Sequence, residues 1–130
     1  MRALQTLNTV NLDTASGVIH FYDTGETSRL ALRREGDYVA ISARYGPIEI
    51  ALRPRYTELE RTLKALQPVE GLQTTRQIGT GQSYLSLGLR SDGALNVRPT
   101  LVADAYGYLS LNLELTSEAR QKLFEWMGIA

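Results

Sequence analysis

The strongest constraint on the fold is an apolar pattern that occurs twice, in which alternating strands precede an amphipathic helix. In the middle of the chain, alternation over 48–52 precedes a predicted helix whose apolar positions are Tyr56, Leu59, Leu63 and Leu66. Near the end, alternation over 109–115 precedes a predicted helix carrying Ala119, Leu123 and Trp126. Self-similarity of this kind is typical of an internal duplication.

A shift of 63 residues aligns the two copies. It places Ile48, Ile50 and Leu52 on Leu111, Leu113 and Leu115, and Leu63 on Trp126. We therefore expect repeats over about 8–67 and 72–130 that share one core within a single domain, 1–130.

Composition excludes several kinds of site. The 130 residues are 43% hydrophobic and 22% charged, as in ordinary globular domains, and the 14 basic and 14 acidic residues cancel. There is no cysteine and a single histidine, His20. We expect no disulfide, thiol nucleophile, metal site or cofactor. With no signal-like or membrane-length apolar segment, the sequence favours a cytoplasmic protein.

Turn residues divide the chain into two sets of strands. Alternation predicts strands at 18–22, 29–34, 38–45 and 48–53, and again near 74–78, 83–91, 94–103 and 107–115. The turn signals include Glu35-Gly36-Asp37 and Ser91-Asp92-Gly93. Thr57-x-x-Glu60 resembles a capping box, although Pro54 suggests that the first helix begins slightly earlier. Thr116 or Ser117 should cap the second helix, and Gly128 should end it.

The alternation separates a buried face from a polar face on these strands. The expected buried set is Leu30, Leu32, Val39, Ile41, Ile48, Ile50, Leu85, Leu87, Leu89, Leu109, Leu111 and Leu113. The opposite set includes Arg53, Ser86, Asn96, Ser110 and Asn112, with Glu49 and Glu114 as its acidic members.

The polar face also carries arginines and tyrosines, a combination suited to single-stranded nucleic acid. Arginines pair with phosphates, and tyrosines stack on bases. The candidate phosphate-binding residues are Arg29, Arg33, Arg44, Arg90 and Arg98, and the candidate stacking residues are Tyr38, Tyr84 and Tyr108. The alternative is that these side chains form the polar outer face that antiparallel sheets commonly have.

Three other motifs are better explained by structure than by chemistry. Asp23-Thr24-Gly25 matches the aspartic-protease signature, but Glu26 stands where that site needs a small residue, so we expect a hairpin turn. Gly79-Thr80-Gly81 precedes a strand and lacks a P-loop lysine, so we expect a loop. His20 alternates with apolar residues and should be partly buried rather than catalytic.

The final helix has a wide apolar surface. Leu123, Phe124, Trp126 and Met127 cover more of it than one side of a small sheet requires. We expect this helix to take part in a homo-oligomer, a dimer or a tetramer.

Two units of four strands and a helix resemble the Whirly family and the related fold of single-stranded-DNA-binding transcriptional coactivators. The resemblance covers residues 17–128. It is closest at Ile50-Ala-Leu-Arg-Pro54, Tyr84-Leu-Ser-Leu-Gly-Leu-Arg-Ser-Asp-Gly93 and Tyr108-Leu-Ser-Leu-Asn-Leu-Glu-Leu-Thr116. The Lys-Gly-Lys-Ala-Ala segment of plant Whirly proteins is absent, so no functional residue is carried over from the family.

This resemblance implies an α+β fold made of a duplicated ββββα unit, in which two antiparallel four-stranded sheets pack across each other with two helices. It also implies a tetramer that binds single-stranded DNA with little sequence preference. We therefore expect a non-enzymatic, oligomeric protein that binds single-stranded DNA, or RNA, in DNA maintenance or transcription. The alternative is a protein-interaction or scaffold domain of the same fold, since tyrosine and arginine are also common at protein interfaces.

Overall fold

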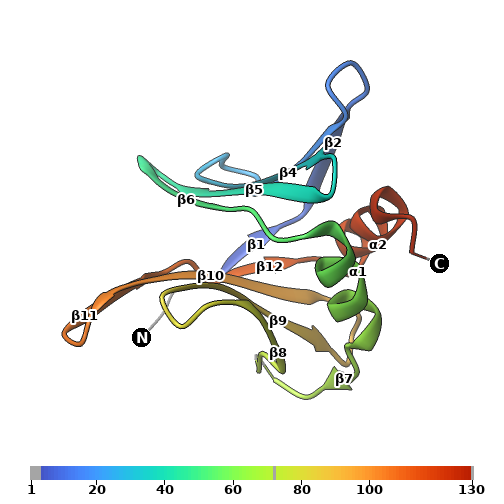
Figure 1. The fold of residues 1–130 in the computed structure, drawn as a ribbon. Helices are drawn as coiled ribbons and strands as arrows, with labels where there is room; N and C mark the ends of the chain where they lie inside the picture. The colour runs from blue at the N-terminus through green and yellow to red at the C-terminus, as the bar shows by residue number, and fades with distance from the viewer. Residues whose placement is uncertain (1–3, 72, 130) are drawn as a thin grey trace.

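The N-terminal half forms a five-stranded antiparallel sheet, the first sheet, in the computed structural model, which describes residues 4–71 and 73–129 (Figure 1). The strands follow chain order because each is joined to the next by a short turn. At the β4–β5 turn Gly36 takes a φ of +62°, which glycine adopts readily. The strands are β2 (Thr9–Asp13), β3 (Val18–Tyr22), β4 (Ser28–Glu35), β5 (Tyr38–Tyr45) and β6 (Ile48–Leu52).

The C-terminal half builds the second sheet, which has seven strands in the described part of the chain. Its main path runs β1–β12–β10–β9–β7, while β11 pairs with β10 and β8 pairs with β9. The strands are β1 (Gln5–Leu7), β7 (Pro68–Val69), β8 (Arg76–Gly79), β9 (Ser83–Arg90), β10 (Leu95–Asp104), β11 (Gly107–Ser110) and β12 (Leu113–Leu115).

The expectation of two purely antiparallel four-stranded sheets is therefore wrong in detail, although the α+β class is confirmed. Two short strands join the second sheet in parallel. β1 pairs with β12, and β7 pairs with β9. Both come from segments that connect or precede the predicted strands.

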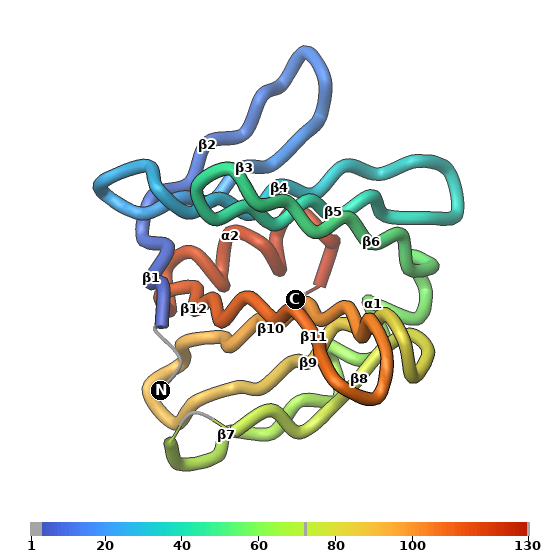
Figure 2. Tube along the Cα trace, turned by 90° about the vertical axis from the view of Figure 1, so that its left-hand side faces the viewer, coloured from blue at the N-terminus to red at the C-terminus, as the bar shows by residue number. Residues whose placement is uncertain are grey.

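The two helices lie between the sheets (Figures 1 and 2). Helix α1 (Tyr56–Ala65) begins before Thr57, as Pro54 suggested. Its N-cap is Arg55, which forms no side-chain capping hydrogen bond, so Thr57-x-x-Glu60 is not a capping box. Helix α2 (Ser117–Met127) is capped as predicted, since Thr116 Oγ1 accepts a hydrogen bond from the N–H of Ala119. Gly128 ends it with a φ of +75°. Within the described residues, neither helix is both long enough and apolar enough to cross a membrane.

Residues from both sheets and both helices form one hydrophobic core. Leu30, Leu95 and Leu113 are at most 2% exposed, and burial of one such side chain stabilises the fold by roughly 1.5–3 kcal/mol. Two predicted core residues instead lie at the surface, since Ile48 is 41% exposed and Leu109 is 38% exposed. Ile48 begins β6, an edge strand of the first sheet, and Leu109 lies on the short strand β11.

The backbone of Gln73 and Thr74, which we call the crossing segment, lies against the outer face of the second sheet at Gly88. A Cβ built at Gly88 would lie 2.0 Å from the carbonyl oxygen of Gln73, so this glycine lets the crossing segment reach the strand. Ser86, Asn96 and Glu114 lie on this outer face and are buried rather than exposed. These three residues lie opposite the core-facing side chains, as predicted, but they are shielded from solvent.

Candidate nucleic-acid interface

The outer face of the second sheet carries a hollow of about 590 Å³ that we call the tyrosine groove. Three of its lining side chains are tyrosines, which come from β9, from the β10–β11 turn and from β11. Arg98 and Asp104 are its charged residues. The remaining lining is mostly small or polar. The groove is lined by Thr74, Tyr84, Ser86, Arg98, Thr100, Val102, Asp104, Ala105, Tyr106, Gly107, Tyr108 and Ser110.

Strand register places the groove tyrosines on the same face. Tyr84 of β9 lies opposite Thr100 of β10, and Tyr108 of β11 lies opposite Val102. Because directly opposed residues share a face, two tyrosines come together from strands that are distant in sequence. Tyr106 stands in the turn and is 97% exposed, and its N–H donates to Asp104 Oδ1 at 2.7 Å, which orders the turn.

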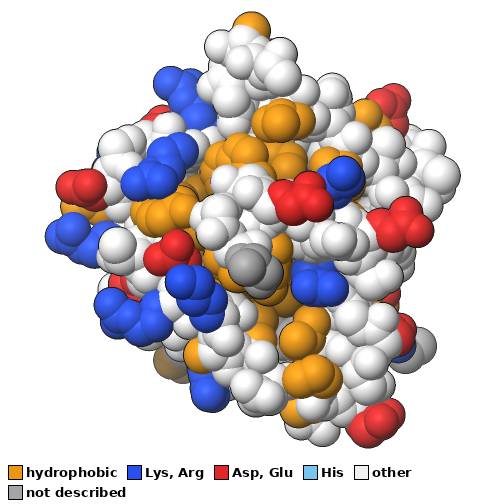
Figure 3. Space-filling view, turned by 90° about the vertical axis from the view of Figure 1, so that its right-hand side faces the viewer, with side chains coloured by type: hydrophobic (Ala, Val, Ile, Leu, Met, Phe, Trp, Pro, Cys, Tyr) orange, Lys and Arg blue, Asp and Glu red, His pale blue; other side chains and the backbone are white. Residues whose placement is uncertain are grey.

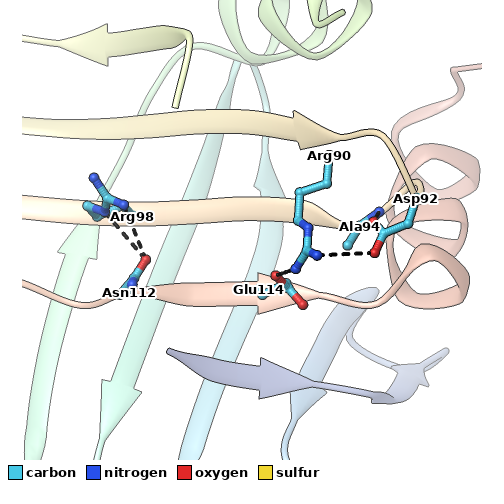
Figure 4. Close-up of polar contacts among 6 residues, drawn as sticks. All are labelled: Arg90, Asp92, Ala94, Arg98, Asn112 and Glu114. Atoms are coloured by element: carbon cyan, nitrogen blue, oxygen red, sulfur yellow. Dashed lines mark hydrogen bonds and ion pairs between the residues drawn. The ribbon is translucent and has the colours of Figure 1, made fainter. Parts of the chain in front are cut away.

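Polar side chains bond to one another along this face. Arg98 donates from Nε and Nη2 to Asn112 Oδ1 at 3.4 Å, as Figure 4 shows. The hydroxyls of Thr100 and Ser110 lie 3.0 Å apart. Arg98 therefore holds its cationic group along the same face as the groove tyrosines, which come from β9, β11 and the β10–β11 turn.

The groove ends where the crossing segment passes over the sheet, since Thr74 belongs to both. Beyond this point Asn96 lies opposite Gly88 and Glu114 and is fully buried. Its Oδ1 and Nδ2 atoms have no hydrogen-bond partner among the described residues. The crossing segment thus separates the open groove from a covered polar region of the same face.

Arg90, at the end of β9, has a side chain that is 31% exposed and forms ion pairs with two carboxylates (Figure 4). Its Nη1 atom is 2.7 Å from Glu114 Oε2, and its Nη2 atom is 3.4 Å from Asp92 Oδ2. The hydrogen bond to Glu114 is the largest reason that the pKa of Arg90 lies above its ordinary value. Of the four candidate residues on the second sheet, Tyr84, Arg98 and Tyr108 line the groove, and Arg90 does not.

Three other candidates, Arg29, Arg33 and Arg44, lie on the first sheet. Arg29 and Arg44 are directly opposed across β4 and β5. Arg33 approaches Glu35 at 3.8 Å, and the Arg29 guanidinium lies 5.5 Å from the ring centre of Tyr22. Of these three arginines, only Arg33 borders a shallow hollow of about 350 Å³, which we call the alanine hollow. It is lined by Val18, Ala31, Leu32, Arg33, Ala40, Ile41, Ser42, Ala51, Leu52 and Arg53.

Tyr38, the last candidate, lies in a third hollow at the start of α1, which we call the arginine cleft. The guanidinium carbons of Arg53 and Arg55 are 4.2 and 5.2 Å from its ring centre, so cations occupy the positions a stacked base would need. The cleft has a volume of about 340 Å³. It is lined by Tyr38, Leu52, Arg53, Pro54, Arg55, Glu58, Ile78, Gly79, Thr80, Ser83, Tyr84 and Leu85.

The structure therefore divides the eight candidates between the two sheets. Sequence reasoning missed Tyr106 and Arg55, one in a turn and the other between a strand and a helix. A signal for Tyr106 existed, since it stands two residues before Tyr108 in Ala105-Tyr106-Gly107.

The motifs set aside as structural occupy turns. Asp23 begins the β3–β4 hairpin connection, where its Oδ1 accepts a hydrogen bond from the N–H of Ser28. Thr80 occupies the β8–β9 turn, where its hydroxyl accepts hydrogen bonds from the N–H groups of Gln82 and Ser83.

The final helix contributes to a further apolar surface. Figure 3 shows hydrophobic side chains gathered at the middle of the face where the two helices lie. Leu12 of β2 is 48% exposed and lines a hollow with Trp126 and the oppositely charged Lys122 and Glu125. Trp126 itself is partly buried and donates from Nε1 to the carbonyl oxygen of Gly17 at 3.0 Å.

Comparison with known proteins identifies no relative. The sequence matches no protein-family model, and no curated protein or solved structure shows significant similarity to it.

Proposed function

We propose that this protein binds single-stranded nucleic acid, with the tyrosine groove as the base-binding surface. The observation that carries the proposal is the grouping of Tyr84, Tyr106 and Tyr108 beside Arg98 around one open hollow. A stacked base gains roughly 1–3 kcal/mol from an aromatic side chain, and an arginine adds attraction for phosphate. Stacking discriminates little among bases, so we expect low sequence preference.

The topology is compatible with the duplicated unit that underlies this proposal. In the first half, β3 to β6 are paired in chain order and are followed by α1. In the second half, β8, β9 and β10 pair in order, β10 pairs with both β11 and β12, and α2 follows. We propose that β11 and β12 together correspond to the fourth strand of the second unit.

Alanine substitution of Tyr108 tests the proposal. Tyr108 is 58% exposed, so Tyr108→Ala should leave the melting temperature nearly unchanged. It should weaken binding of labelled single-stranded DNA by about 5- to 150-fold, the equivalent of one lost stacking contact. The matched control is Tyr45→Ala, since Tyr45 is 39% exposed on the first sheet. Equal affinities for the wild type and Tyr108→Ala would refute this use of the groove.

A second candidate function is protein binding at the alanine hollow. Its small apolar side chains would admit a partner's backbone closely, and Arg33 and Arg53 at its border suit an acidic partner. Salt separates the two functions, because phosphate binding weakens steeply with ionic strength and an apolar interface responds much less. A protein that binds no oligonucleotide at low salt would favour this second function.

We also propose that two copies associate through β2 and the neighbouring surface of α2. Strand β2 lies at a sheet edge and pairs only with β3 in the described structure. In an antiparallel pair centred on Asn11, Val10 of one copy would face Leu12 of the other. The row of apolar side chains formed by Phe21 and Val10, which are opposed across β2 and β3, would then continue into the second copy. Leu12→Lys should convert the dimer to a monomer in light scattering, and a wild-type monomer at high concentration would contradict this assembly.

A further inference from the structure

The tyrosine groove and the arginine cleft meet at one residue. Tyr84 lines both hollows, although the groove lies on the outer face of the second sheet and the cleft lies beside the N-terminal end of α1. Tyr84 is the second residue of β9 and lies opposite Gly79, beside the hairpin turn between β8 and β9. This turn is therefore the ridge that separates the two hollows.

Two residues of this turn region, Gly79 and Gly81, are glycines and carry no side chain. A Cβ at Gly79 would lie 2.4 Å from the carbonyl oxygen of Ser83, so the turn excludes any larger residue there. A Cβ at Gly81 would have no neighbour within 4 Å, which shows that this glycine is open to its surroundings. The Thr80 hydroxyl is bonded to the turn itself through the N–H of Ser83 at 3.2 Å.

The two hollows offer different chemistry. The groove presents tyrosines with a single cation, whereas the cleft presents two guanidinium groups that cover the ring of Tyr38. Arg53 donates to Glu35 at 3.0 Å, and Glu58 also lines the cleft. In the described part of the chain, no carboxylate forms an ion pair with Arg55. Arg55 is therefore the cation of the cleft best suited to an added phosphate.

We propose that a single strand held in the tyrosine groove continues over the β8–β9 turn into the arginine cleft, where Arg55 binds its backbone phosphate. The inference rests on the proposed function. It adds the path that the bound strand follows and assigns a different role to each hollow. Bases stack in the groove, and phosphates bind in the cleft. Because the cleft is a separate hollow, only strands long enough to cross the turn reach it.

Oligonucleotide length tests this path. We would measure anisotropy of labelled oligothymidylates of about 4 to about 16 nucleotides, at several salt concentrations, with the wild type and Arg55→Gln. The matched control is Arg61→Gln, which removes an exposed arginine from α1 outside the cleft. Both variants lose one positive charge, so a difference between them reports position rather than net charge.

Arg55→Gln should leave the affinity for the shortest oligomers unchanged and weaken binding of the longest by about 3- to 10-fold at low salt. The slope of log affinity against log salt should fall by about 0.7 for the long oligomers, the value for one phosphate contact to a single strand. Arg61→Gln should match the wild type. Long-oligomer binding that is unchanged in Arg55→Gln, or lost equally at every length, would overturn the path and leave the groove proposal standing. No wild-type binding at any length would overturn the proposed function itself.

Discussion

Replacement of Gly88 by alanine tests whether the crossing segment is packed against β9. The new Cβ would lie 2.0 Å from the Gln73 carbonyl oxygen and 2.9 Å from the Cα of Thr74. Both contacts are with backbone, which cannot rotate away as a flexible side chain can. The segment would have to move by roughly 1 Å, and Thr74 would move with the groove wall that it forms.

Two opposing terms set the size of the effect. Overpacking of this kind costs about 1–3 kcal/mol, whereas alanine in place of glycine within a strand gains about 0.5–1 kcal/mol. The glycine has no positive φ, so no backbone strain is added. Because the clash is with backbone, the cost should lie in the upper half of its range. The net loss should then be about 1–2.5 kcal/mol, or a fall in melting temperature of about 4–10 °C for a chain of this size.

Urea denaturation and thermal melting measure this loss directly. The control is Gly81→Ala, since a Cβ there meets nothing within 4 Å and Gly81 also lacks a positive φ. That variant should be as stable as the wild type or slightly more stable. If Gly88→Ala proved equally stable, the crossing segment would not lie against β9, and the groove would lack its end wall.

Three further predictions concern stability. Arg90→Met should cost about 1–3 kcal/mol in denaturant melts because it leaves the 8%-exposed Glu114 without its partner, and adding Glu114→Leu should restore most of the loss. Leu113→Ala should cost about 2.7–5 kcal/mol, whereas Ile48→Ala at the 41%-exposed position should cost under about 1 kcal/mol, and equal losses would contradict the assigned core. Hydrogen bonds from the Ser16 side chain and from the N–H groups of Ala15 and Ser16 hold the pKa of Asp13 below its ordinary value of 3.8. The carboxylate thus stabilises the fold above that value and stops doing so as pH falls through the lowered pKa. The melting temperature of the wild type should therefore drop more than that of Asp13→Asn between about pH 5 and pH 2.

Local signals in the sequence predicted most of the regular structure. Alternation identified the long strands, since Leu30, Leu32, Val39 and Ile41 all lie in the core. Turn and cap chemistry was equally informative at Gly36 and at Thr116. Each of these signals depends on a residue's own conformational preference or on neighbours a few positions away.

The short parallel strands could not be predicted in the same way. β1 has three residues and β7 has two, which is too few for alternation to be visible. Their pairing depends on the positions of β12 and β9 in the folded sheet, beside which β1 and β7 lie in parallel. The burial of Asn96 was equally hidden from sequence, since Asn96 lies opposite Gly88, and the backbone that approaches Gly88 is that of Gln73 and Thr74, which alternation in β10 does not report.

The candidate site shows the same limit. Alternation placed Tyr84, Arg98 and Tyr108 on a polar face, and all three line one groove. It could not show that Arg29, Arg33 and Arg44 belong to a different sheet. Alternation shows which side of its own strand a residue lies on, but not which sheet the strand joins. Nor could it show that Arg53 and Arg55 cover the ring of Tyr38.

The most direct test of the central claim is fluorescence anisotropy of a labelled single strand of about 30 nucleotides against its duplex, at low and moderate salt. The account predicts submicromolar binding that prefers the single strand and weakens as salt rises, because bases stack on the groove tyrosines and arginines bind phosphates. A folded protein that binds neither form at low salt, or binds both equally, would contradict the assignment of the tyrosine groove to single-stranded nucleic acid.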